Sequence, residues 1–146
     1  MPIEICVDSE DLDVPLEQIH KGCEILLSAM NPPDPELTLL FTDNKKIREL
    51  NKEFRNLDKA TDVLSWSYGD DSDFPDSVEG EIAISVEYAS REAEERGHSL
   101  EKELWELIVH GIVHIEGPDH EIESEVERFS ARADELKSLL KENYIL

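Results

Sequence analysis

The stretch SLEKELWELIVHGIVHIEGPDH, residues 99–120, predicts a helix that lies inside the domain. Ser99 is a suitable N-cap for this helix, and Gly117 and Pro118 are suited to end it. Apolar side chains occur on more than one side, which is typical of a helix largely buried in a domain rather than lying on its surface. These side chains are Leu100, Leu104, Leu107, Ile108, Ile112 and Ile115. We therefore expect a central helix.

The segments around this helix combine strand and helix patterns. Strands are expected at residues 2–8, 36–41, 62–68 and 81–86, and helices at residues 15–30, 86–97 and 122–143. A further helix is expected to follow a cap at Thr42 or Asp43 and to use Ile47, Leu50 and Phe54 as its apolar side. The last two strands are expected to pair as a wide hairpin. The pattern predicts an α/β (α+β) fold, with helices packed on a single small mixed sheet of about four strands, in one domain over residues 1–146.

Composition narrows the class of protein. Of 146 residues, 39% are hydrophobic and 34% charged, which favours a folded chain over a disordered one. The N-terminal sequence lacks the pattern of a secretory signal, and no apolar segment is long enough to cross a membrane. Cys6 and Cys23 form no CxxC pair and are expected to be small core residues. We expect a cytoplasmic protein without a membrane partner.

The net charge of −22 opposes non-specific binding to a polyanion, because an acidic surface repels phosphates at long range. Residues 43–59 are an exception, with six basic and four acidic side chains. Lys52 and Lys59 in this segment are candidate contacts for a nucleic-acid backbone. A solvated helix face with mixed charges is the alternative interpretation of the same segment.

The strongest chemical signal is a group of histidines. His110 and His114 are four residues apart, so a helix places both imidazoles on one face, where they can bind one metal ion. The turn permitted by Gly117 and Pro118 can bring His120 to the same ion. Three imidazoles leave a fourth position open, which indicates a catalytic zinc site, although a structural metal stays an alternative. His20 and His98 stand apart and are expected to be ordinary surface residues.

One residue separates this pattern from that of a zinc protease. The HxxxHxxGxxH spacing is that of the metzincins, but Gly111 stands where those enzymes have the glutamate that acts as general base. Zinc can still lower the pKa of water to about 7, which suits a substrate with a better electrophile. A phosphodiester of RNA is such a substrate, and it offers its own 2′-hydroxyl as a nucleophile.

Two blocks give the chain a resemblance to the YbeY family of bacterial endoribonucleases and rRNA maturation factors. The family pattern H-G-x-x-H-x-x-G-x-D-H is matched by residues 110–120, and the segment RNLDKATDVLSW is matched at residues 55–66. The resemblance extends from about residue 37 to about residue 140. Departures include Trp66, where the family usually has phenylalanine, and Phe129, at a place often held by methionine.

The resemblance implies one zinc ion per chain, bound by His110, His114 and His120, with His110 and Arg55 in catalytic roles. Arg55 is expected to orient the scissile phosphate, since a guanidinium is always charged and binds phosphate with two hydrogen bonds. The implied activity is cleavage of single-stranded rRNA, in 3′-end maturation of 16S rRNA and ribosome quality control, with the ribosomal subunit or ribosomal proteins as partners. Two alternatives stay open: a non-catalytic ribosome-assembly factor with a structural zinc, and a metalloprotease.

Overall fold

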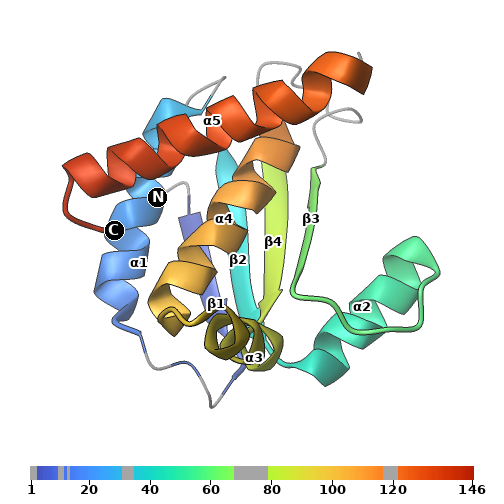
Figure 1. Ribbon diagram of the computed structural model, residues 1–146. Coiled ribbons are helices and arrows are strands. Elements are labelled where there is room, and N and C mark those ends of the chain that lie inside the picture. The colour runs from blue at the N-terminus through green and yellow to red at the C-terminus, as the bar shows by residue number, and fades with distance from the viewer. Residues whose placement is uncertain (1–2, 10–11, 13, 31–34, 68–78, 117–121) are drawn as a thin grey trace.

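The computed structural model describes residues 3–9, 12, 14–30, 35–67, 79–116 and 122–146, and it places a four-stranded sheet among helices (Figure 1). The strands are β1 (Ile3–Val7), β2 (Glu36–Thr42), β3 (Val63–Ser67) and β4 (Glu79–Ser85). Their order is β1-β2-β4-β3, in which β2 is parallel to both β1 and β4, and β3 is antiparallel to β4. The mixed sheet and the pairing of its last two strands confirm the prediction.

The helices are α1 (Leu16–Ala29), α2 (Asn44–Arg55), α3 (Val86–Arg96), α4 (Leu100–Glu116) and α5 (Ile122–Glu142). Side-chain caps fix where α2 and α4 begin. The Asp43 carboxylate accepts a hydrogen bond from the backbone N–H of Lys46 at 3.0 Å, and the Ser99 hydroxyl accepts one from that of Lys102 at 3.1 Å. Both caps were predicted, because short polar side chains satisfy the free N–H groups of a helix start.

Alternate residues of β4 belong to different layers of the molecule. Ile82 and Ile84 enter the main core with α1, α3, α4 and α5, whereas Ala83 belongs to a small cluster with Ile47 of α2 and Leu64 of β3. Side chains alternate across a strand, so α2 covers one face of the sheet and the other helices cover the opposite face. In Figure 1, α4 lies against the sheet and α5 crosses α4. Site residues carried by α2 and by α4 must therefore meet across an edge of the sheet.

The central position of α4 agrees with its apolar pattern. Leu104, Leu107, Ile108, Ile112 and Ile115 are buried, while Leu100 packs against the core at its margin. No helix among the described segments is both long and apolar enough to cross a membrane.

Two expectations about individual side chains need correction. Phe54 was expected on the buried face of α2, but its side chain is 59% exposed, because α2 ends at the next residue and its last turn lies beyond the small core around Ile47. Cys23 is buried, and burial raises the pKa of its thiol to about 12, as expected for a core cysteine. Cys6 is only partly buried, since β1 is an outer strand of the sheet.

Candidate active site

The two histidines of α4 face each other. Their Nε2 atoms are 3.1 Å apart and their ring centroids 4.7 Å apart, and both side chains are exposed. The four-residue spacing accounts for this arrangement, since residues one turn apart lie on the same side of a helix. In neutral imidazole, Nε2 is either a donor or a metal-binding lone pair, so two facing Nε2 atoms suit either a shared proton or a shared ion.

The distance between these nitrogen atoms fits a zinc ion. Tetrahedral zinc with Zn–N bonds of 2.0–2.1 Å separates two ligand nitrogens by about 3.3 Å. The observed 3.1 Å between the Nε2 atoms of His110 and His114 is close to that value. His120, the third expected ligand, lies outside the described residues, and within those residues no set of three histidine, cysteine or carboxylate side chains is placed to hold a metal.

Phe129 of α5 forms a wall behind both histidines. Its ring centroid lies 4.8 Å from that of His110 and 5.0 Å from that of His114. The protein atoms packed beside His114 exclude part of the solvent from its imidazole, and this desolvation lowers its pKa, while positive charge on His110 and on Arg55 lowers that pKa further. A neutral imidazole is the form that binds a metal ion, so these surroundings favour the ligand state of His114.

Arg55 reaches the site from the opposite layer of the molecule. It is the last residue of α2, which ends because Asn56 adopts a left-handed conformation with φ of 58°. The guanidinium Nη2 donates a hydrogen bond to the carbonyl oxygen of Ser65 at 3.2 Å. Because β3 is an outer strand of the sheet, this bond fixes Arg55 at the sheet edge, where its charge acts on His114. The charge of Arg55 thus acts on His114 although the two residues are far apart in sequence.

The turn after α2 is held by a buried asparagine. The Asn51 side chain is 2% exposed, and its Nδ2 donates a hydrogen bond to the carbonyl oxygen of Lys59 at 3.0 Å. The backbone carbonyl of Asn51 also accepts a hydrogen bond from the N–H of Leu57 at 3.2 Å. These bonds define the path of residues 56–59 and with it the position of Arg55.

Lys52 and Lys59 are exposed, as expected for candidate contacts to a backbone. Lys59 lines a shallow pocket of about 390 Å³ that contains neither histidine, together with Lys45 and Arg48. Arg48 is paired there with Asp58, with 2.7 Å between Nε and Oδ1, and this hydrogen bond lowers the pKa of the Asp58 carboxyl group. The structure therefore brings His110 and His114 into contact, holds Arg55 on β3 where its charge acts on His114, and places Lys59 in a neighbouring pocket.

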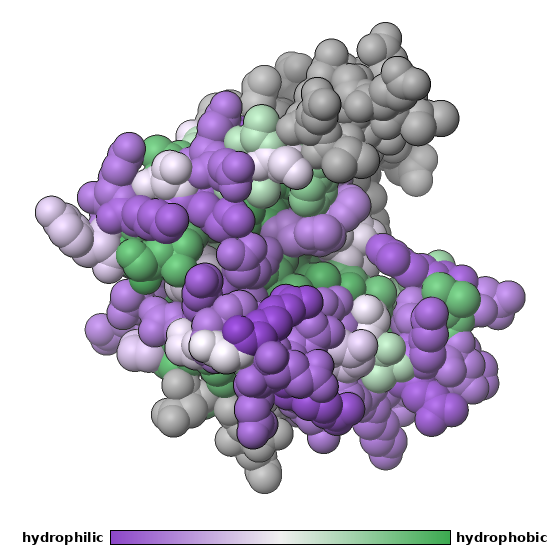
Figure 2. Space-filling model, viewed as in Figure 1, coloured by the Kyte–Doolittle hydropathy of each residue, from purple (hydrophilic) through white to green (hydrophobic). Residues whose placement is uncertain are grey.

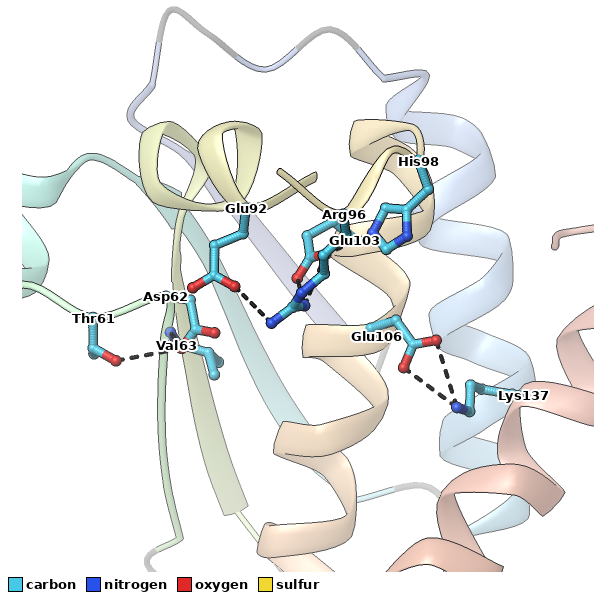
Figure 3. Close-up of polar contacts among 9 residues, drawn as sticks. All are labelled: Thr61, Asp62, Val63, Glu92, Arg96, His98, Glu103, Glu106 and Lys137. Carbon is cyan, nitrogen blue, oxygen red and sulfur yellow. Dashed lines mark hydrogen bonds and ion pairs between the residues drawn. The ribbon is translucent and has the colours of Figure 1, made fainter. Parts of the chain in front are cut away.

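A second cavity of about 270 Å³ opens beside His110 between α4 and α5. Its lining includes Phe129 and the ion pair between Glu106 and Lys137, in which Nζ lies 3.3 Å from Oε2 (Figure 3). This cavity gives the histidine pair a mixed polar and apolar neighbourhood on the side of α5.

The sequence interpretation missed a polar cluster near the N-terminal end of α4. Glu103 is completely buried, and its two carboxylate oxygens accept hydrogen bonds from Nη1 of Arg96 at 3.0 and 2.7 Å (Figure 3). His98, expected to be an ordinary surface residue, is 20% exposed, and its Nε2 lies 2.6 Å from the Glu103 carboxylate. The expectation for His98 was wrong, because Gly97 turns the chain so that His98 faces α4.

Comparisons with known proteins identify the family. The family described as Endoribonuclease YbeY matches residues 4–141. Among proteins named Endoribonuclease YbeY, that of Aquifex aeolicus is 44% identical over 89% of this chain and 81% of its own length. That of Heliobacterium modesticaldum is 40% identical over 87% of this chain and 82% of its own length. A Thermotoga maritima protein of known solution structure shares the fold, with a TM-score of 0.62 and 24% identity over 98% of this chain and 94% of that chain. The chain belongs to the Endoribonuclease YbeY family, as its two motifs indicated.

Proposed function

We propose that this protein is a zinc-dependent endoribonuclease that cleaves single-stranded RNA beside His110 and His114. The observation that carries this proposal is the pair of facing Nε2 atoms, 3.1 Å apart, next to the charge of Arg55. A metal-binding pair beside a fixed guanidinium suits the cleavage of a phosphodiester, in which negative charge develops on phosphate oxygens. The names of the relatives support RNA as the substrate.

His110, His114 and His120 are the proposed ligands of one zinc ion per chain. When bound, zinc supplies a Lewis acid that polarises a phosphoryl oxygen and makes water more acidic. The nucleophile is water or the 2′-hydroxyl of the RNA. Phe129 limits the access of solvent to both imidazoles from the side of α5, which strengthens electrostatic interactions at the site.

Arg55 is the proposed phosphate-orienting residue. Its hydrogen bond to Ser65 uses one N–H of a guanidinium that carries five, so other N–H groups stay available for two phosphate oxygens. The bond also holds the side chain in place before the substrate arrives, which reduces the cost of ordering it in the transition state. Arg55 therefore binds the phosphate and offsets its developing charge.

Lys52 and Lys59 are the proposed contacts to the flanking RNA backbone. Both are exposed on or just after α2, the basic part of a chain whose net charge is −22. Because the remaining surface is acidic, a basic partner is expected to bring this protein to its RNA. Ribosomal proteins of the cytoplasm are suited to that role. Within this proposal, rRNA is the substrate implied by the resemblance, including the 3′ end of 16S rRNA.

A metalloprotease is disfavoured by the surroundings of Gly111. This residue packs against β4, and a Cβ atom added to it lies 2.9 Å from Cδ1 of Ile82. A glutamate at this position therefore has no room where α4 meets the sheet. The remaining alternative, a ribosome-assembly factor with a structural zinc, requires no cleavage and no role for Arg55.

The test is an RNA-cleavage assay on the zinc-loaded protein with a labelled single-stranded oligonucleotide. Cleavage is expected to stop on treatment with a chelator and to return with zinc. Arg55→Ala is expected to lower kcat by about 100-fold or more, the usual effect of losing a group that stabilises transition-state charge. Arg91→Ala, which removes an exposed arginine of α3, serves as the matched control.

Cleavage that survives complete removal of metal would contradict the proposal. Zinc binding and association with ribosomal subunits that persist in Arg55→Ala, with no cleavage by the unmodified protein, would support the assembly factor. Chelator-sensitive cleavage of a peptide would support the protease.

A further inference from the structure

An aromatic pair lies beside Arg55. The rings of Phe54 and Trp66 are stacked, with centroids 5.5 Å apart and planes inclined by 24°. Trp66 packs on the small core of Ile47 and Leu64, which anchors it. Phe54 lies on the outside of this stack and is 59% exposed. The ring of Trp66 is thus held by the small core, and the ring of Phe54 presents much of its surface to solvent.

The aromatic pair and the guanidinium are held by the same two segments. Phe54 and Arg55 are consecutive in α2, and Ser65 and Trp66 are consecutive in β3. Phe54 stacks on Trp66, and Arg55 donates its hydrogen bond to Ser65. Two adjacent contacts between the same helix and strand fix the ring of Phe54 relative to the guanidinium. Since Phe54 precedes Arg55 in the chain, the exposed ring lies beside the residue that is proposed to bind the scissile phosphate.

Charge and size indicate what this ring contacts. Helix α2 carries five basic and two acidic residues in a protein of net charge −22, so its surface favours an anionic partner. Figure 2 shows an apolar patch on the otherwise hydrophilic lobe of α2, where the exposed apolar side chains are Phe54 and Leu57. Two side chains are too few for a stable protein interface, whereas one aromatic face beside a cation is enough for a nucleotide.

We propose that Phe54 is a base-stacking residue, on which the unpaired base next to the phosphate bound by Arg55 stacks. This inference rests on the proposed function and adds how the substrate is selected. A base and its phosphate are joined through a single ribose, so a phosphate at Arg55 places a neighbouring base within reach of the ring. A base in a duplex has its faces covered by its neighbours, so Phe54 selects RNA that is single-stranded at the cleavage site.

The experiment measures the affinity of the zinc-loaded protein for a fluorescent single-stranded 2′-O-methyl RNA oligonucleotide, checked to be intact after each titration. Phe54→Leu keeps an apolar cover on Trp66 but removes the aromatic face, and Phe54→Trp keeps that face. Leu57→Ala is the matched control, because Leu57 is a neighbouring exposed apolar residue. Oligonucleotides with an abasic site at each position in turn identify the base that stacks.

Phe54→Leu is expected to weaken binding about tenfold, which lies within the range for the loss of one base–aromatic stack. Phe54→Trp and Leu57→Ala are expected to bind like the unmodified protein. An abasic site at one position is expected to abolish the difference between Phe54→Leu and the unmodified protein, which a purely structural role of Phe54 does not predict.

Equal affinities of Phe54→Leu and the unmodified protein would overturn the inference, as would a loss that is the same whichever base is removed. Failure of the unmodified protein to bind the oligonucleotide would overturn it as well. Phe54-dependent stacking without any cleavage of ordinary RNA would leave the inference standing and remove the proposed function, so the two failures are distinguishable.

Discussion

Histidine and charged side chains lie at both ends of α4, but their surroundings differ. Near its N-terminal end, the buried carboxylate of Glu103 is contacted by Arg96 and by His98, and all the distances are between 2.6 and 3.0 Å. Near its C-terminal end, His110 and His114 are exposed and face each other. A buried charge must have its partners within the fold, whereas exposed facing nitrogens are available to an outside group. The first arrangement supports stability and the second supports binding.

This difference explains why the sequence of α4 predicted the histidine pair but not the cluster around Glu103. The histidine pair was predicted because its geometry depends on a spacing of four residues within one helix. By sequence, Glu103 is an acidic residue of a first helical turn, where a carboxylate is favourable for any helix. Its burial depends on the packing of α3 against α4, which no spacing within one helix reveals. The combination of Arg96, Gly97 and His98 just before the helix was the available signal.

Glu103→Gln tests the role of the buried carboxylate, because it keeps the shape of the side chain and removes its charge. The amide NH₂ group then faces Arg96 and His98, which are donors. We expect the free energy of unfolding to fall by about 2 kcal/mol, the usual value of hydrogen bonds to a charged group. Urea denaturation measures this change, and the zinc content of the folded variant is expected to stay unchanged.

Glu101→Gln is the matched control, because Glu101 lies in the same first turn and is only partly buried. It is expected to change the stability by less than about 0.5 kcal/mol, as is usual for positions near the surface. Equal effects of the two substitutions would contradict the structural role of the Glu103 cluster.

A smaller loss of stability is expected for a substitution at Gly111, which lies between the two ends of α4. Gly111→Ala places a Cβ atom 2.9 Å from Cδ1 of Ile82, so α4 and β4 must shift slightly apart. The cost of overpacking, reduced by the higher helix propensity of alanine, is expected to be about 1 kcal/mol of unfolding free energy. Ile82→Val removes Cδ1, the nearest atom, but keeps Cγ1 and Cγ2, which lie 3.0 and 3.2 Å from the added Cβ, so it is expected to relieve part of this cost in the double variant. Additive losses in urea denaturation would argue against a direct contact between these two positions.

The remaining parts of the site differ in how far sequence could predict them. Asp43 and Ser99 were recognised as caps because a cap depends on a few neighbouring residues. The approach of Arg55 to His114 depends on the position of β3 at the sheet edge, so spacing alone could not predict it, and the family resemblance supplied the expectation. Phe54 follows the apolar period of α2, but the small core ends before the helix does. Periodicity predicts the face of a helix and not how much of that face is covered.

Zinc binding distinguishes the histidine environments at the two ends of α4 in one measurement. Zinc is determined per chain, after dialysis, in the unmodified protein, in His114→Ala and in His98→Ala, with folding checked by circular dichroism. We expect one zinc per chain in the unmodified protein and in His98→Ala, and loss of zinc from folded His114→Ala. Zinc retained by His114→Ala, or lost from folded His98→Ala, would contradict the assignment of the metal to the C-terminal end of α4.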